Sequence, residues 1–260
     1  MTEPDSVTTP SETLKSDDWR RRYPHIAEVM DQKTPPLTPE QAAKRAERLR
    51  AEEERQIEGR KSDARNRMAR RLGKRYSPEN CNLESFKVYH DKQRVVLDRL
   101  RALVPTLPEF VRAGRGLVFY GSVGTGKDHL LAACLYAACN ADLACSWING
   151  PELFGTFRDA MGTEQREAAI VETLTRPDVL GVSDPIPPIG DVNAWRIETL
   201  YRVLDARYRD GKSTWVSFNT LDPKEADAKL SAPVFDRIRH DAEMFSCFWP
   251  SFRERRKDEK

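Results

Sequence analysis

Apolar residues along the chain form two kinds of pattern, one helical and one of short continuous runs. The runs predict buried strands at residues 116–120, 144–148, 179–182 and 214–218, with helices between them at 129–140, 151–161 and 195–209. Strands that alternate with helices predict an α/β domain, in which helices cover both faces of a parallel sheet. A further helix is predicted ahead of the first strand by apolar residues at helical spacings: Val88, Val95, Val96, Leu97, Leu100 and Leu103.

The N-terminal part has a different, mostly polar pattern. Residues 1–40 are rich in Ser, Thr, Pro and charged residues, which predicts a disordered tail. Its aromatic and basic cluster at 19–24 either docks on a partner or is incidental. A helix is predicted from Thr38 to about Leu72, since threonine caps a helix and the proline after it suits the first helical position. The segment 41–75 is therefore a basic helical segment, either a solvated helix or a surface for nucleic-acid phosphates.

Composition narrows the class of protein. Charged residues make up 32% of the chain, and the mean hydropathy is −0.68. No apolar run approaches the ~18 residues that cross a bilayer, and the N-terminus is acidic and polar, unlike a signal peptide. These features predict a cytoplasmic protein without a membrane partner. The five cysteines include no C-x-x-C pair, so neither a disulfide framework nor a zinc site is predicted.

The segment 121–127 reads GSVGTGK and fits the phosphate-binding pattern G-x-x-x-x-G-K between a predicted strand and a predicted helix. Its glycines let backbone N–H groups point at a phosphate, the helix start adds a positive dipole end, and Lys127 adds a mobile charge. One position departs from the pattern, because Asp128 replaces the Ser or Thr that normally binds Mg²⁺. A carboxylate there can also bind the metal, so we expect tight metal dependence. The predicted nucleotide-contacting residues are Gly121, Ser122, Val123, Gly124, Thr125, Gly126, Lys127, Asp128 and His129.

Residues 116–130, GLVFYGSVGTGKDHL, resemble the phosphate loop of the DnaC/IstB-type AAA+ ATPases, a family of replicative helicase loaders and transposition helpers. The segments 75–76 and 82–89 resemble the lead-in of these proteins. Further along, 217–219 resembles their sensor strand, 235–239 their arginine-finger helix and 249–253 their closing segment. The resemblance implies a P-loop NTPase fold of the AAA+ type, with an ATPase domain at 76–260 that binds ATP and Mg²⁺.

The resemblance also implies roles for single residues. Asn219 would position the γ-phosphate or the attacking water, and Arg253 would sense the γ-phosphate. Arg237 would reach the nucleotide of a neighbouring subunit. An arginine supplied across an interface makes hydrolysis depend on assembly, so we expect a homo-oligomer when ATP is bound. The alternatives are surface ion pairing for Arg237 and a solvated tail for Arg253.

Members of the family carry two adjacent acids after a strand. Here Ser183-Asp184 follows the predicted strand at 179–182, so a serine replaces the first acid. Asp184 is the candidate catalytic base, and Asp128 and Asp184 are the candidate metal ligands. The hydroxyl expected at 128 and the carboxylate expected at 183 have changed places, which leaves the local charge unchanged. One hypothesis is a compensated exchange that keeps Mg²⁺ binding, and the other is a site that has lost hydrolysis and only binds.

The functional hypothesis is an ATP-binding protein of DNA replication. It would act as a DnaC-like loader whose contact with single-stranded DNA and a replicative helicase depends on ATP. An alternative that no residue separates from it is an IstB-like transposition helper that recruits a transposase. A nucleotide-binding module without turnover is a third reading. A small-molecule kinase is a fourth, for which the sequence has no evident acceptor site or lid.

Overall fold

The computed structural model describes residues 21–25, 28, 37–187, 192–220 and 222–253. The chain divides into two units, Met1–Glu53 and Glu54–Lys260. Most of the predicted disordered tail, including Trp19 of the aromatic cluster, lies outside the described residues. Every helix in the described ranges is too short or too polar to span a bilayer.

Helix α3, Pro39–Leu72, has the bounds that the sequence predicts. Side chains cap its start, since the N–H of Thr38 donates to Gln41 Oε1 (3.1 Å) and the N–H of Gln41 to Thr38 Oγ1 (3.3 Å). In the second unit, its last turns bury Met68 and Leu72 in the core. At this end α3 therefore buries one apolar face, formed by residues four positions apart, while Arg67 and Arg70 stay exposed on the rest of the helix.

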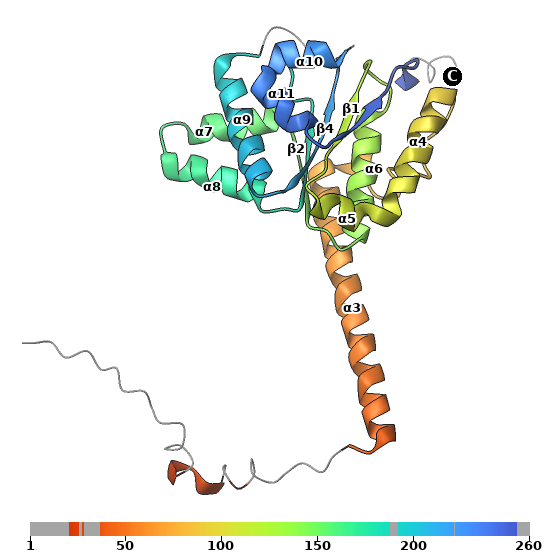
Figure 1. Cartoon of the computed structure of the whole chain (residues 1–260), viewed down its shortest axis with the longest axis vertical. Coiled ribbons are helices and arrows are strands. Elements are labelled where there is room, and N and C mark those ends of the chain that lie inside the picture. The colour runs from red at the N-terminus through yellow and green to blue at the C-terminus, as the bar shows by residue number, and fades with distance from the viewer. Residues whose placement is uncertain (1–20, 26–27, 29–36, 188–191, 221, 254–260) are drawn as a thin grey trace, which may run out of the picture. The chain divides into compact units, whose positions relative to one another are not determined.

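Five parallel strands form one sheet in the order β2-β3-β4-β1-β5. Figure 1 labels three of them, β2, β4 and β1. Four of them agree with the predicted strands to within one residue at each end, which confirms the α/β fold. The sequence does not predict the fifth, an edge strand whose four residues EMFS include two polar ones. The strands are β1 (Leu117–Tyr120), β2 (Cys145–Asn149), β3 (Val179–Ser183), β4 (Ser213–Phe218) and β5 (Glu243–Ser246).

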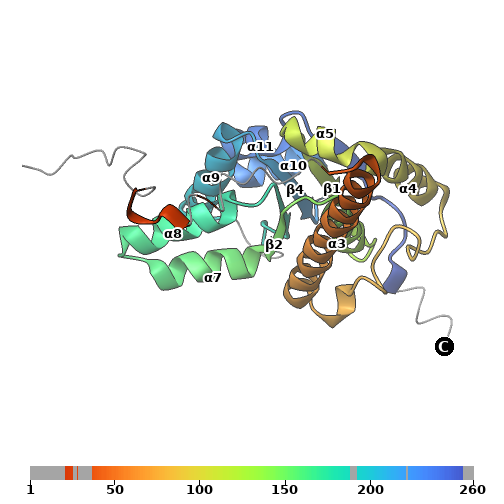
Figure 2. The same ribbon diagram turned by 90° about the horizontal axis from the view of Figure 1, so that it is seen from below.

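Helices cover both faces of the sheet (Figures 1 and 2). One face carries α4 (Asp91–Leu103), α5 (Leu107–Arg112) and α6 (Lys127–Asn140), with the 3₁₀ turns η1 (Lys74–Tyr76) and η2 (Val104–Thr106) before α4 and α5. The other face carries α7 (Gly150–Ala160), α8 (Glu164–Thr175), α9 (Ala194–Arg209), α10 (Pro223–Leu230) and α11 (Ala232–Arg239). The sequence predicts α4, α6, α7 and α9, but not α8 or α10, which have few large apolar residues.

Alternating side chains of each strand enter two separate cores. In β1, Leu117 and Phe119 pack on the side of α6, while Val118 packs on the side of α9. In β4, Trp215 lies in the first core and Val216 in the second. This period of two decides which polar residues near the strand ends face α6.

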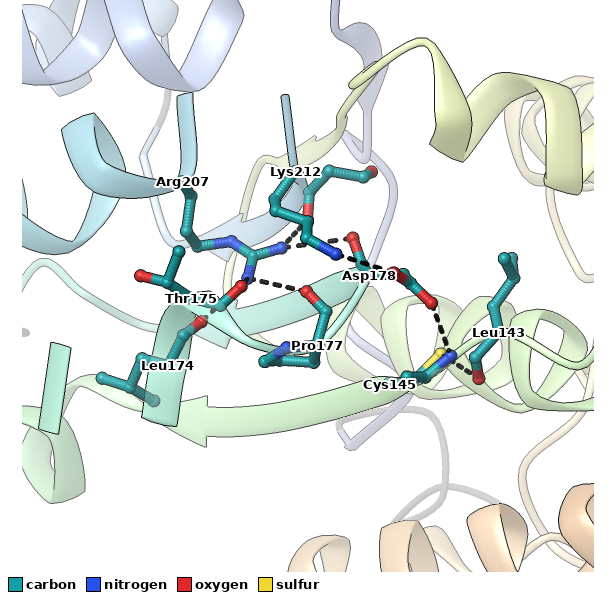
Figure 3. A network of polar contacts seen from close by, with 10 residues as sticks. Leu143, Cys145, Leu174, Thr175, Pro177, Asp178, Arg207 and Lys212 are labelled. Atoms are coloured by element: carbon teal, nitrogen blue, oxygen red, sulfur yellow. Dashed lines mark hydrogen bonds and ion pairs between the residues drawn. The ribbon is translucent and has the colours of Figure 1, made fainter. Parts of the chain in front are cut away.

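A buried arginine joins the amino ends of β3 and β4 (Figure 3). Arg207 of α9 is 0% exposed. Burial lowers its pKa to about 10, with Asp178 opposing the shift, so the guanidinium stays charged at neutral pH. It donates to the carbonyls of Leu174 (2.8 Å), Thr175 (3.3 Å), Pro177 (3.0 Å), Asp178 (3.3 Å) and Ser213, and to Thr214 Oγ1 (2.9 Å).

The carboxylate of Asp178 extends this network to β2. It accepts from the N–H of Ala144 (3.0 Å) and from Lys212 Nζ (2.9 Å). Because Ala144, Asp178 and Ser213 lie at the starts of β2, β3 and β4, the network fixes the register of these three strands.

We predict that Arg207→Leu lowers the free energy of unfolding by about 3–5 kcal/mol, because buried carbonyls lose their donors. The matched control is Arg209→Leu on the same helix, which removes an exposed ion pair with Asp205 (3.2 Å). This control should cost less than about 1 kcal/mol. Urea denaturation of the full chain measures both, and equal losses would contradict the anchoring role of Arg207.

Candidate nucleotide-binding site

The segment 121–127 forms the loop between β1 and α6, at the carboxyl edge of the sheet. Gly124 and Gly126 have φ angles of 80° and 92°, which residues with a side chain rarely adopt. At Gly124, an added Cβ would also collide with the Ser251 hydroxyl. Helix α6 begins at Lys127, so the positive end of its dipole lies at this loop, as a phosphate site requires.

The C-terminal segment packs against the loop. The N–H of Cys247 donates to Tyr120 O (2.7 Å), and the N–H of Phe252 donates to Gly124 O (3.0 Å). The indole of the buried Trp249 donates to Thr125 O (2.8 Å), which gives its N–H the acceptor that a buried tryptophan needs. These contacts bring Arg253 to the same cavity as the loop.

Lys127 points back over its own loop. Its ammonium donates to Gly121 O (3.0 Å) and Ser122 O (2.6 Å), and the side chain is only 5% exposed. Burial lowers the pKa of Lys127, and the carboxylates of Asp128 and Asp184 are among the charges that oppose the shift. An ammonium has three N–H donors, so one remains for a phosphate oxygen beside the two loop carbonyls.

Two carboxylates lie at the edge of the sheet, and donors from β4 and its end hold one oxygen of each. Ser217 Oγ donates to Asp128 Oδ1 (2.7 Å). Asn219 Nδ2 donates to Asp184 Oδ1 (2.7 Å), and Asp184 has a left-handed backbone with φ of 47°. Ser183, the expected exchange partner of Asp128, is buried and makes no side-chain hydrogen bond to Asp128 among the described residues. The sequence reasoning missed Ser217 as a site residue, although it stands two positions before Asn219.

Asp128 affects the pKa of Asp184. Burial, and next the negative charge of Asp128, raise the pKa of Asp184 to about 6, against the opposing charges of Lys127 and Arg253. A pKa near neutral suits a residue that takes a proton from water. A positive charge between the two groups would relieve this repulsion.

A cavity of about 390 Å³ collects most of the predicted site residues. Gly121 and Ser122 are not among its lining residues, but their carbonyls hold Lys127. A larger hollow of about 700 Å³, between α8 and α9, contains no predicted site residue. The predicted residues that line the smaller cavity are Val123, Gly124, Thr125, Gly126, Lys127, Asp128, His129, Asp184, Asn219 and Arg253.

The lead-in segment supplies a second wall of the cavity, although the sequence analysis predicted no individual roles for its residues. His129 holds this wall against the loop, with its Nε2 3.2 Å from Asn82 O and its ring edge-on to Phe86 (centroids 5.4 Å apart). The aromatic and basic residues between 75 and 89 are the signal that points to such a wall. The lining residues outside the predicted set are Arg75, Tyr76, Asn80, Ser85, Phe86, Lys87, Tyr89, Gln93 and Phe252.

Arg237 lies away from this cavity. Its Nε donates to Asp205 Oδ1 (3.3 Å), and its guanidinium carbon is 4.2 Å from the centroid of the Tyr208 ring. It lines a different hollow together with Gly116, beside the start of β1. Within one chain Arg237 is therefore an ion-paired surface residue, and it cannot serve the nucleotide site of its own subunit.

The donor set fits a magnesium ion that is shared with phosphates. No group of three or more His, Cys, Asp or Glu residues within the described ranges could hold a metal. Mg²⁺ is commonly bound by one or two carboxylates together with phosphate oxygens and water. Asp128 and Asp184 would hold the ion, which would relieve their repulsion and neutralise phosphate charge when bound.

Two known proteins are similar to this chain in sequence. The replicative helicase loader DnaC of Buchnera aphidicola subsp. Acyrthosiphon pisum is 28% identical over 202 residues, which cover 72% of this chain and 75% of the relative. The insertion sequence IS232 putative ATP-binding protein of Bacillus thuringiensis subsp. berliner is 26% identical over 149 residues, or 55% of this chain and 58% of that protein.

Solved structures and a family model agree with the fold. The crystal structure of the DnaC helicase loader matches with a TM-score of 0.59 and 24% identity, covering 67% of this chain and 99% of that chain. This confirms the predicted P-loop NTPase fold of the AAA+ type. The model of the IstB-like ATP binding proteins matches residues 22–260. The chain therefore belongs to the family of IstB-like ATP binding proteins.

Proposed function

We propose that this protein is an ATPase that loads a replicative helicase during DNA replication, with ATP and Mg²⁺ bound in the cavity beside Lys127. The observation that carries the proposal is the convergence of a buried lysine, two held carboxylates and a helix start on one cavity. Triphosphate binding requires this combination, because positive charge and backbone N–H groups face the phosphates while carboxylates hold the metal. The similarity to DnaC loaders supports the choice of helicase over other partners.

In this mechanism each residue of the site has a separate role. Lys127 binds the β- and γ-phosphates, and Asp128 holds the metal. Asp184, held by Asn219, accepts a proton from the attacking water. Arg253 contributes charge from the cavity rim, where it already acts on Asp184.

A second subunit completes the site in this proposal. Because Arg237 lies away from its own cavity, it would act on the nucleotide of a neighbour in a homo-oligomer that forms when ATP is bound. Arg237 would have to exchange its bond with Asp205 for the phosphate. Assembly and hydrolysis would thereby be linked.

A second candidate function is a transposition helper that recruits a transposase. The observation that favours it is the similarity to the insertion-sequence protein of Bacillus thuringiensis. Purified replicative helicase and purified transposase, each tested for ATP-dependent binding to this chain, separate the two functions. Binding to the transposase alone would replace the loader proposal.

We predict that Lys127→Ala weakens ATP binding roughly 10- to 100-fold, because a hydrogen bond to a charged group contributes about 1.5–3 kcal/mol. The control is Lys92→Ala, which removes an exposed lysine from α4. Calorimetric titration with saturating Mg²⁺ measures both variants. If the unaltered protein bound neither ATP nor ADP, the proposed function would fail.

Substitutions at positions 128 and 183 test whether the site hydrolyses ATP or only binds it. If the exchange is compensated, Asp128→Thr combined with Ser183→Asp should keep ATP hydrolysis, since the acid and the hydroxyl then occupy each other's places. Each single change should lower hydrolysis, because the charge near the metal changes by one. Phosphate release with and without single-stranded DNA measures this. Harmless single changes would count against coupling, and an unaltered protein without turnover would favour a nucleotide-binding module.

Single-stranded DNA is the proposed ligand of the basic helix α3. Some of its arginines are already engaged, as Arg60 pairs with Asp142 (2.8 Å) and Arg65 with Glu58 (3.3 Å). Deletion of 41–75 would also remove Met68 and Leu72 from the core, so point substitutions are the better probe.

We predict that DNA affinity falls steeply with salt, and that replacing Arg55, Arg67 and Arg70 by Gln lowers the salt slope by about 2, at about 0.7 for each phosphate contact. These three arginines are exposed. Three exposed arginines outside α3, namely Arg112 of α5, Arg166 of α8 and Arg176 just after α8, give a control with the same change of charge. Salt-insensitive binding, or equal effects of both triple variants, would remove α3 from the DNA site.

A further inference from the structure

Ser217 contacts both acidic residues of the candidate metal site. Its hydroxyl donates to Asp128 Oδ1 (2.7 Å), and its backbone carbonyl accepts from the N–H of Asp184 (2.8 Å). The residue is 0% exposed and lies in the middle of the sheet, where β4 pairs with β1 and β3. A single rigid position therefore touches α6 and the end of β3 at once.

The hydrogen bond fixes one rotamer of Asp128. A hydroxyl has one hydrogen, and here Oδ1 of the carboxylate accepts it. The other oxygen, Oδ2, makes no hydrogen bond or ion pair with any described residue. Asp128 also lies in the first turn of α6, where the helix dipole favours a negative charge. The outcome is a carboxylate group with one oxygen held by Ser217 and the other available to a ligand.

Alternation along β4 explains why a serine is at this position. Trp215 packs in the core on the side of α6 and Val216 in the opposite core, so Ser217 faces α6. An apolar residue at 217 would leave Asp128 without its donor beside a buried strand. Ser183 is the register partner of Ser217 on β3 and faces the same side, yet Asp128 accepts its hydrogen bond from Ser217.

We propose that Ser217 is a positioning residue for magnesium: its hydroxyl orients Asp128 so that the second carboxylate oxygen meets the ion beside the bound phosphates. This inference rests on the proposed nucleotide function. In this proposal the hydroxyl that accompanies the unusual acid Asp128 is that of Ser217 on β4, and not that of Ser183 on β3. Ser217 itself touches neither metal nor nucleotide in this arrangement.

The test compares ATP affinity with Mg²⁺ and with EDTA, by calorimetric titration of the full chain. Ser217→Ala should reduce the gain in affinity that Mg²⁺ provides by about tenfold, the effect of one hydrogen bond to a charged group. The affinity in EDTA should stay within about twofold, since the phosphate loop does not depend on this hydroxyl. Ser217→Thr, which keeps the hydroxyl, should restore the gain. Ser146→Ala, a half-buried serine on β2, is the matched control.

Different results would contradict the role of Ser217 and the proposed binding of ATP. If Ser217→Ala weakens binding equally with Mg²⁺ and with EDTA, its role is structural and the inference is overturned. A loss of the magnesium gain in Ser183→Ala, with none in Ser217→Ala, would also overturn it. Should Ser217→Ala fail to fold by circular dichroism, Ser217→Cys keeps the volume with a weaker donor, and an unchanged magnesium gain there contradicts the inference. If the unaltered protein binds no ATP at all, both proposals fail.

Discussion

The register of the central strands, fixed at their amino ends by Arg207 and Asp178, is the constraint on which the candidate site depends. Side chains alternate along a strand, so a slip of one residue would turn a whole strand face over. In β4 such a slip would replace Ser217 by Val216 or Phe218 on the side of α6. The charged network at one edge of the sheet therefore decides which groups reach the carboxylates at the other edge.

At the carboxyl edge of the sheet, opposite charges lie close together. Lys127 is a buried cation, and burial together with the nearby charge of Asp128 raises the pKa of Asp184. Each group alone would be unfavourable out of water, but together they suit a ligand that carries both phosphates and a divalent ion. The hydroxyl expected at 128 and the carboxylate expected at 183 have changed places, which leaves the number of acids at this edge unchanged, and Ser217 holds one oxygen of Asp128.

Segments far apart along the chain enclose the loop. The C-terminal residues Trp249 and Phe252 bond to its carbonyls, and the lead-in segment lies against His129. Arg75 and Tyr76 of this lead-in follow directly after α3 and line the cavity. A nucleotide in the cavity would therefore lie beside the residues that connect the α/β core to α3.

The sequence by itself determined the α/β class, four of the five strands, the bounds of α3 and the phosphate loop, because periodic apolar patterns and glycine-rich turns are local properties. The resemblance to the AAA+ family added the fold type and the candidate roles of Asn219 and Arg253. Only the tertiary structure decided that Ser217 bonds to Asp128, that Met68 joins the core and that Arg237 lies away from its own cavity. These facts depend on strand order and on contacts between residues far apart in sequence, which no local pattern encodes.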